Sequence, residues 1–320
     1  MNLSLIIPVY NEQDNLPFLF EAIYKVMNPL NKAWEAILVD DGSRDNSLSV
    51  LKEYAQNDPR HIRVISFRRN FGQTAAIAAG LDYAQGEIIV LLDADMQNDP
   101  ADIPMMLAKL DEGYDLVSGW RKSRKDNALT RNFPSMIANW IISSVTGVHL
   151  HDYGCTLKVY RRDVLEGFRL YGEMHRFIPV YASSVGAKIT EVPVSHYPRK
   201  YGKTKYGLER TAKVMLDLFT VKFLVAYSSK PIYLFGGTGG LLMVISTIMM
   251  IYLFVRRLFF LVSVTGSPLL QVSVMLFILG FQSMLMGLIA ELLVRTYHES
   301  QRKPTYTIRS IINLEQDPRD

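Results

Sequence analysis

The stretch Glu87-Ile88-Ile89-Val90-Leu91-Leu92-Asp93-Ala94-Asp95 carries the most information about the fold of this chain. Its apolar run predicts a mostly buried strand that delivers two carboxylates to its carboxyl end, the edge where open α/β sheets bind ligands. Side chains alternate along an extended segment, so Asp93 and Asp95 are expected to point the same way. Two like charges held this close repel unless a proton or a cation lies between them. A divalent ion on a substrate's phosphates is one interpretation. A solvated strand end, with Asp95 capping a helix, is the other.

The first 120 residues alternate between short apolar runs and longer amphipathic segments. Strand–helix alternation at this spacing predicts a mainly parallel sheet covered by helices on both faces. The expected strands are residues 3–9, 36–39, 63–66, 88–92 and 116–117. The expected helices are residues 16–27, 43–56, 73–84 and 102–112.

Polar motifs follow four of these strands in chain order. Carboxylates and amides at such positions can hydrogen-bond a base and ribose, and Ser43 is expected to cap the helix that follows it. Each motif is short, but four in order at strand-to-helix junctions favour a nucleotide site over a solvated strand end. The motifs are Pro8-Val9-Tyr10-Asn11-Glu12, Asp40-Asp41-Gly42-Ser43, Arg69-Asn70-Phe71-Gly72-Gln73 and Asp93-Ala94-Asp95-Met96-Gln97.

The C-terminal third differs in composition from the rest of the chain. Hydrophobic residues make up 49% of the 320 residues, and residues 231–255 and 258–290 contain no charged side chain. About 20 apolar residues cross a bilayer, so we expect two membrane spans at 231–255 and 269–293. A buried hairpin in a soluble protein is the alternative. Residues 207–230 mix apolar and charged side chains, which is typical of an amphipathic segment at a membrane surface.

The N-terminus lacks the features of a signal peptide, because polar residues follow the apolar run 3–9 at once. We therefore expect an integral protein of the cytoplasmic membrane with its active site and both termini in the cytoplasm. The single cysteine, Cys155, excludes an intramolecular disulfide and agrees with a reducing compartment. Basic runs at 121–125 and 199–205 suit phosphate or lipid headgroups, and we expect no nucleic-acid partner.

These motifs resemble those of GT-A-fold family 2 glycosyltransferases, and within them the polyprenyl-phosphate sugar transferases of the dolichyl-phosphate mannose synthase and bactoprenol glucosyltransferase type. The resemblance covers nearly the whole chain, since the two C-terminal spans match the bactoprenol branch. Besides the four strand-end motifs, it rests on Asp99-Pro100, Ser118-Gly119-Trp120-Arg121, Asp152-Tyr153-Gly154-Cys155 and Tyr201-Gly202-Lys203-Thr204-Lys205-Tyr206.

The resemblance implies a Rossmann-like, mainly parallel GT-A domain, juxtamembrane amphipathic helices and two transmembrane helices. The expected boundaries are 1–206 for the catalytic domain, 207–230 for the juxtamembrane helices, 231–295 for the hairpin and 296–320 for a cytoplasmic tail. It also implies Mg²⁺ or Mn²⁺ held on the diphosphate of a nucleotide sugar by Asp93, Asp95 and Gln97. The implied nucleotide-sugar-binding residues are Pro8, Tyr10, Glu12, Asp40, Asp41, Asn70 and Gln97.

The implied acceptor is a polyprenyl phosphate, which is largely dianionic at neutral pH. An anionic nucleophile needs positive charge to hold it in line with the sugar carbon more than it needs a strong base. Arg121 and Arg131 are the first candidates, and Asp152 is either an orienting residue or a base. The full set of implied acceptor-phosphate residues is Arg121, Arg131, Ser135, Arg199, Lys203 and Lys205.

The expected reaction is inverting transfer of a hexose to polyprenyl phosphate. Glucose from UDP-glucose is the first choice, because of the bactoprenol-type tail, and a GDP-mannose-dependent mannosyltransferase is the alternative. A processive polysaccharide synthase is less favoured, because no tryptophan lies in a Gln-x-x-Arg-Trp segment. A membrane-anchored nucleotide-sugar binding protein without turnover is the alternative from a different class. The membrane and juxtamembrane helices also offer a surface for a homo-oligomer.

Overall fold

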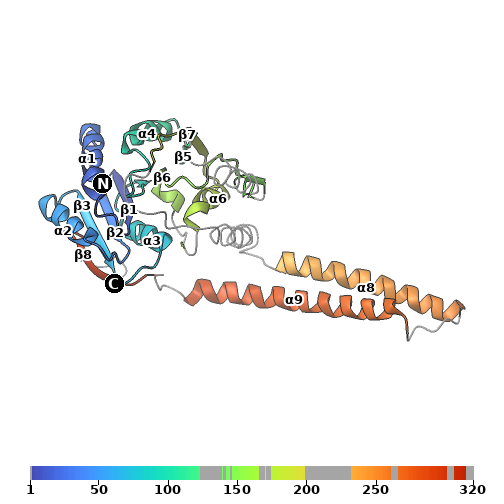
Figure 1. The fold of residues 1–320 in the computed structure, drawn as a ribbon. Coiled ribbons are helices and arrows are strands. Elements are labelled where there is room, and N and C mark those ends of the chain that lie inside the picture. The colour runs from blue at the N-terminus through green and yellow to red at the C-terminus, as the bar shows by residue number, and fades with distance from the viewer. Residues whose placement is uncertain are drawn as a thin grey trace. The chain divides into compact units, whose positions relative to one another are not determined.

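The computed structural model describes residues 2–122, 139, 142–144, 146–165, 170, 174–198, 232–260, 266–300 and 306–314. The chain forms two compact units (Figure 1). The first comprises Met1–Val221 and Pro304–Asp320, and the second comprises Lys222–Lys303. The chain therefore leaves the first unit, builds the second, and returns to the first with its last residues.

An eight-stranded sheet organises the first unit. Its strands are β1 (Leu3–Val9), β2 (Trp34–Asp40), β3 (Ile62–Phe67), β4 (Ile88–Leu91), β5 (Leu116–Trp120), β6 (Lys158–Arg161), β7 (Ile189–Pro193) and β8 (Ile308–Ile312). They lie in the order β7-β5-β6-β4-β1-β2-β3-β8. The central strands β4, β1, β2 and β3 run parallel to one another, and β7 runs parallel to β5. By contrast, β6 is antiparallel to both its neighbours and β8 is antiparallel to β3.

Helices cover both faces of this sheet. Alternate residues of β1, from Leu3 to Val9, join one apolar core with α1, α2 and α4. Ile6 faces the opposite side, where a Cβ on Gly80 of α3 would lie 2.3 Å from its Cγ2 atom. The helices of this unit are α1 (Leu16–Met27), η1 (Asn28–Leu30), α2 (Ser47–Asn57), α3 (Gln73–Tyr83), η2 (Pro100–Asp102), α4 (Ile103–Asp111), η4 (Arg162–Leu165), η5 (Met174–Phe177) and α6 (Ile178–Ser184).

The fold class predicted from the sequence, a mainly parallel sheet followed by two long apolar helices, is confirmed. Two local expectations were wrong. Strand β4 ends at Leu91, and Asp95 lies in the turn that follows, so side-chain alternation does not relate Asp93 to Asp95. Helix α2 begins at Ser47 rather than near residue 43, so Ser43 does not cap it. The segment 207–230 lies outside the described residues.

The second unit contains two helices, α8 (Ile232–Phe260) and α9 (Pro268–Ser300). The parts long and apolar enough to cross a membrane are Phe235–Phe259 and Pro268–Ile289, close to the predicted spans. Only 17% of each span is buried, so these helices are not core helices of a soluble domain. Large apolar side chains such as Phe254 and Phe259 are instead exposed along the unit, as expected for lipid contact.

Two glycines let α8 and α9 approach closely. A Cβ on Gly239 would lie 2.5 Å from the carbonyl oxygen of Gly280, and a Cβ on Gly280 would lie 2.7 Å from that of Gly239. The Ser246 hydroxyl donates to the Ser273 carbonyl at 2.6 Å across the same interface. Small residues and serine hydrogen bonds are the usual means by which membrane helices associate.

This close approach gives a testable difference between neighbouring glycines. Gly239→Ala is expected to destabilise the hairpin by about 1–3 kcal/mol, because the added methyl group meets backbone. Gly240→Ala is the matched control, since its Cβ would meet nothing within 4 Å and alanine favours a helix. Thermal unfolding of the full chain in detergent measures both, and equal midpoints for the two variants would contradict this packing.

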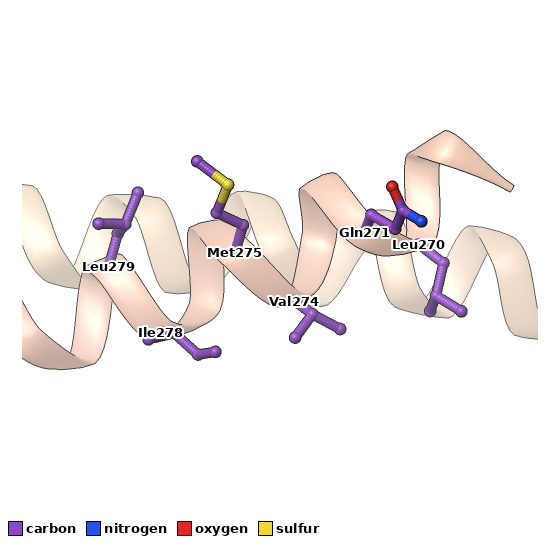
Figure 2. Close-up of a pocket in the computed structure, with 6 residues that line it drawn as sticks. All are labelled: Leu270, Gln271, Val274, Met275, Ile278 and Leu279. Carbon is purple, nitrogen blue, oxygen red and sulfur yellow. The ribbon is translucent and has the colours of Figure 1, made fainter.

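A shallow pocket lies on the surface of α9 (Figure 2). Its lining comes from α9 alone and is apolar except for one amide. The lining residues are Leu270, Gln271, Val274, Met275, Ile278 and Leu279. This composition suits contact with hydrocarbon rather than with a polar ligand.

Candidate active site

The carboxyl ends of the four central parallel strands meet at one edge of the sheet. Because β4, β1, β2 and β3 are neighbours in that order, the residues that follow them gather there. The structure therefore places the four predicted motifs at one edge of the sheet. Tyr10 and Glu12 come from the first strand end, Asp40 and Asp41 from the second, Asn70 from the third, and Asp93 from the fourth.

Asp41 holds the loop of residues 68–72, which follows β3. One of its carboxylate oxygens accepts from the backbone N–H of Phe71 at 2.6 Å, and the other accepts from that of Gly72 at 2.9 Å. Burial raises the pKa of Asp41 to about 6 against the opposing effect of these two donors. Gly42, with φ +67°, allows the turn after β2 to lie close to the 68–72 loop, because a Cβ there would lie 2.5 Å from the Arg69 carbonyl carbon.

Asp40 is buried, and both its carboxylate oxygens accept hydrogen bonds. The backbone N–H of Ser43 donates at 3.1 Å, and the hydroxyl of Ser66 on β3 donates at 3.1 Å. These contacts brace the turn after β2 from two sides. Contact of Asp40 with a base or ribose stays a prediction.

The loop after β1 is tied to the loop after β2. The backbone N–H of Asn11 donates to the Ser43 hydroxyl at 3.0 Å, and that of Glu12 donates to the Ser47 hydroxyl at 2.9 Å. Asn11 adopts a left-handed conformation with φ 54°. Ser43 therefore joins two strand-end loops instead of capping α2. Pro8 and Tyr10 lie in the same part of the chain, and their contact with a nucleotide stays a prediction.

The charges of Asp93 and Asp95 repel each other, although strand β4 ends before both residues. Burial, and then the negative charge of Asp95, raise the pKa of Asp93 to about 6. The Gln73 amide donates to Asp93 at 2.7 Å, and the backbone N–H of Gln97 donates to Asp95 at 3.1 Å. Met96, which follows Asp95, adopts a left-handed conformation with φ 58°.

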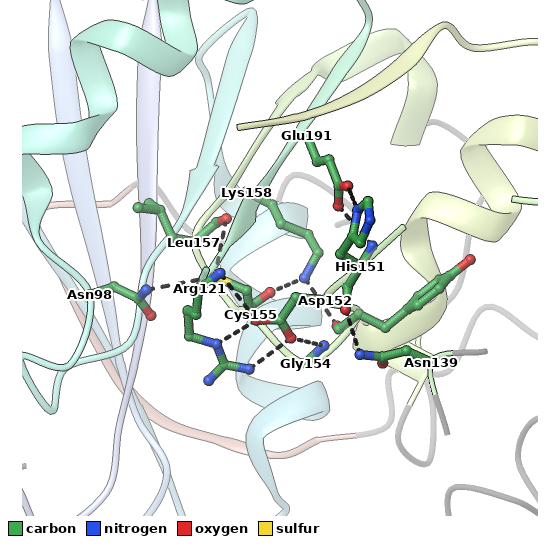
Figure 3. A network of polar contacts seen from close by, with 11 residues as sticks. Asn98, Arg121, Asn139, His151, Asp152, Gly154, Cys155, Leu157, Lys158 and Glu191 are labelled. Atoms are coloured by element: carbon green, nitrogen blue, oxygen red, sulfur yellow. Dashed lines mark hydrogen bonds and ion pairs between the residues drawn. The ribbon is translucent and has the colours of Figure 1, made fainter. Parts of the chain in front are cut away.

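Arg121, at the end of β5, forms a two-pronged ion pair with Asp152 (Figure 3). Its Nε atom donates to one carboxylate oxygen at 2.6 Å, and its Nη2 atom donates to the other at 2.9 Å. Burial opposes the charge of the guanidinium, but the hydrogen bonds and charge of Asp152 outweigh it and raise the pKa of Arg121. The Arg121 charge partly offsets the rise in the pKa of Asp93, so the Arg121–Asp152 pair is within electrostatic range of Asp93.

Lys158 of β6 is a buried cation that the sequence analysis missed. Its ammonium group donates to the carbonyls of Tyr153 and Cys155, within the turn that carries Asp152 (Figure 3). Burial lowers its pKa to about 8. The run Thr156-Leu157-Lys158-Val159 alternates polar and apolar side chains, so the sequence predicts an exposed lysine at this position. Cys155 is buried and burial raises its thiol pKa, which makes it a packed residue rather than a nucleophile.

The other predicted acceptor residues lie outside the described part of the chain. These are Arg131, Ser135, Arg199, Lys203 and Lys205. Hydrogen bonds join Asp41 to the 68–72 loop and Gln73 to Asp93, and the Arg121 charge acts on Asp93. The donor-site and acceptor-site roles of the predicted residues stay predictions.

A family profile described as Glycosyl transferase family 2 matches residues 4–168, which is more than half of the chain. The chain belongs to this family. It is a glycosyltransferase, and the family resemblance and the enzyme class expected from the motifs are both confirmed.

Two curated relatives of this glycosyltransferase match nearly end to end. Dodecaprenyl-phosphate galacturonate synthase of Rhizobium johnstonii is 40% identical over 98% of this chain and 94% of that protein. Undecaprenyl-phosphate 4-deoxy-4-formamido-L-arabinose transferase of Salmonella choleraesuis is 36% identical over 98% of this chain and 95% of that protein.

Solved structures share the fold of the glycosyltransferase. The glucosyl-3-phosphoglycerate synthase of Mycobacterium tuberculosis, crystallised with Mn²⁺, UDP and phosphoglyceric acid, aligns with a TM-score of 0.53 at 16% identity, over 70% of this chain and 78% of that chain. Staphylococcus aureus TarS with UDP-GlcNAc aligns with a TM-score of 0.51 at 19% identity, over 70% and 67%. At these identities the likeness supports the GT-A fold alone.

Proposed function

We propose that this glycosyltransferase moves a sugar from a nucleoside diphosphate sugar to a polyprenyl phosphate, with inversion at the sugar carbon. The names of the two curated relatives support the acceptor class. One structural observation carries the proposal: the apolar hairpin α8–α9 is inserted between the catalytic fold and its own strand β8. The site is therefore tethered to the bilayer in which a polyprenyl lipid resides.

Asp93 and Asp95 fit a divalent cation such as Mg²⁺ or Mn²⁺. Their mutual repulsion is relieved by a cation, and carboxylate oxygens are the ligands that these ions prefer. Among the described residues, no group of three or more His, Cys, Asp or Glu side chains forms a metal site. A protein nevertheless often binds Mg²⁺ through only one or two carboxylates, and substrate phosphates and water molecules supply the other ligands. Gln97 as a third ligand stays a prediction.

When bound, such an ion offsets the charge that develops on the departing nucleoside diphosphate. The protein's own part is to hold donor and acceptor in line. A phosphate oxygen of the acceptor forms a bond to the anomeric carbon as the bond from that carbon to the donor diphosphate breaks. The products are a polyprenyl phosphate sugar and a nucleoside diphosphate. The dianionic phosphate attacks without first losing a proton, so the step requires no strong base.

Asp152 acts in this scheme as an orienting residue. Its two oxygens are occupied by Arg121, and one of them also accepts from the Gly154 N–H at 3.1 Å. A carboxylate neutralised by a guanidinium is a weak base. Arg121, held by Asp152, presents positive charge beside Asp93, where donor and acceptor phosphates would meet.

We place the active site and both termini in the cytoplasm. Strand β8 pairs with β3, so the segments before and after the hairpin belong to one folded unit and lie on one side of the membrane. The exposed apolar faces of α8 and α9 are where we would expect a second copy of the chain to associate, if the protein is a homo-oligomer.

The donor sugar has two leading candidates. The resemblance to the bactoprenol branch favours UDP-glucose. The 40% identical relative is a galacturonate synthase, which favours a galacturonate donor. GDP-mannose and a 4-deoxy-4-formamido-L-arabinose donor complete the set, the latter from the second relative.

A donor panel tests the proposal. Membranes containing the chain are incubated with each labelled nucleotide sugar, with and without added polyprenyl phosphate, and the lipid is extracted. We expect label in the lipid fraction with one donor, increased by the added acceptor and removed by chelation of divalent ions. Absence of lipid label with all four donors would contradict the proposed function.

A further inference from the structure

Strand β8, which lies among the last described residues of the chain, is hydrogen-bonded to β3 from Val64 to Phe67. Strand β8 pairs antiparallel with it, from Ile308 opposite Phe67 to Ile312 opposite Val64 (Figure 1). The pairing extends into the loop after β3, because the backbone N–H of Arg68 donates to the Thr307 carbonyl at 3.1 Å. Strand β8 is therefore the outermost strand of the sheet. The start of segment 306–313 lies at the carboxyl end of β3, where the candidate site is.

Tyr306 anchors the end of this segment that lies nearest the site. Its side chain is only 5% exposed, and its ring stacks on that of Phe67 with centroids 5.1 Å apart. Its hydroxyl donates to Asp82 of α3 at 2.6 Å. A residue that follows the apolar hairpin thus packs into the catalytic unit against both a strand and a helix.

Phe67 connects Tyr306 with the loop of residues 68–72, because its ring contacts both Tyr306 and Phe71. Its ring meets the Phe71 ring edge to face at 5.6 Å, and the Arg69 guanidinium lies 4.4 Å from the centroid of the Phe71 ring. The backbone N–H of Phe71 in turn donates to Asp41. A continuous set of packed groups therefore runs from Tyr306 through Phe67 and Phe71 to the predicted donor residues.

A second connection runs through the strand pairing. Ser66, whose hydroxyl donates to Asp40, lies opposite Ser310 of β8. The opposite end of β8 is tied down far from the site, where the Asn313 amide donates to the carbonyls of Ala55 and Ile62 at 2.7 and 2.9 Å. The two ends of the segment can therefore be perturbed separately.

We propose that Tyr306 is a positioning residue of the donor site, which through Phe67 and Phe71 holds the 68–72 loop in the form that binds the nucleotide. This rests on the proposed function, since it assumes that the loop contacts the donor. It gives a residue that follows the apolar hairpin a role in donor binding. Tyr306 acts through other residues and touches no reacting atom.

The test compares four variants of the full chain in detergent. Tyr306→Ala removes the stacked ring and the hydroxyl, whereas Tyr306→Phe keeps the ring. Asn313→Ala removes two hydrogen bonds at the far end of the same strand, and Arg309→Ala alters an exposed side chain of β8. Each variant is measured by hydrogen exchange of the 68–72 amides without ligand, and by calorimetric titration with UDP in the presence of Mn²⁺.

We expect Tyr306→Ala to speed exchange at Phe71 and Gly72 and to weaken UDP binding about tenfold, the change that one lost aromatic pair produces. Tyr306→Phe, Asn313→Ala and Arg309→Ala should keep loop exchange and UDP affinity within about twofold of the parent chain. Unchanged loop exchange in a folded Tyr306→Ala chain would overturn the proposal, as would a loss of UDP affinity in Asn313→Ala as large as in Tyr306→Ala. A parent chain that binds no UDP would count against the UDP donor, and loop exchange would then decide the role of Tyr306 by itself.

Discussion

Replacing Asp95 with asparagine is expected to lower the rate of sugar transfer by about 100- to 1,000-fold while the fold is retained. The asparagine side chain keeps an oxygen that can accept from the Gln97 N–H, so the turn after β4 has no reason to open. What is lost is one of the two negative charges that face each other at this strand end. Divalent ions should accordingly bind more weakly, which calorimetric titration with Mn²⁺ and UDP measures.

A matched control for Asp95→Asn is Asp111→Asn. Asp111 is exposed at the end of α4, and the substitution makes the same change in charge away from the strand-end site. We expect wild-type transfer from this variant. Transfer at the wild-type rate by a folded Asp95→Asn chain would remove the two carboxylates from the mechanism.

Replacing Arg121 with lysine is expected to cause the second large loss of activity. Lysine keeps the positive charge but cannot form the two-pronged contact with Asp152. The variant also avoids leaving a buried carboxylate without a cation, which destabilises a protein by about 3–5 kcal/mol. We expect kcat to fall about 100-fold, the usual loss when a positioned donor is removed from an active site.

Asp152→Asn separates an orienting role from a general base. Loss of an orienting partner costs about 10-fold or somewhat more, whereas loss of a general base costs about 10²- to 10⁴-fold. We expect the smaller loss, and we expect the double variant with Arg121→Lys to be little worse than Arg121→Lys alone, because the two residues act as one pair. Loss of about 1,000-fold or more in Asp152→Asn with Arg121 intact would identify Asp152 as the base instead.

Much of the catalytic sheet was predictable because its strands are buried on both faces. The run 3–9 reads as a strand by composition alone, and the polar motifs after each run mark where the strand ends. Parallel neighbours bring those ends to one edge, so grouping Asp40, Asp41 and Asp93 required no structure. The two apolar helices could also be predicted from the sequence, because residues 231–255, for example, contain no charged side chain.

Other features depend on contacts that no local pattern encodes. Strand β8 is five residues long, and its partner β3 comes from the first quarter of the chain, before both apolar helices. Ser43 has the composition of a helix cap, but its hydroxyl is taken by Asn11. Lys158 looks like a surface residue, yet the carbonyls of the 152–155 turn solvate its charge inside the protein. Each outcome is set by tertiary structure.

In the proposed reaction the chain joins a sugar to the phosphate of a polyprenyl phosphate. The most direct test is product analysis with purified protein, polyprenyl phosphate and the donor selected by the panel. Mass spectrometry of the lipid and quantification of the released nucleotide should show one sugar on a single phosphate and one nucleoside diphosphate per sugar transferred. Release of nucleoside monophosphate with a sugar on a lipid diphosphate, or hydrolysis of the donor without a lipid product, would contradict the account.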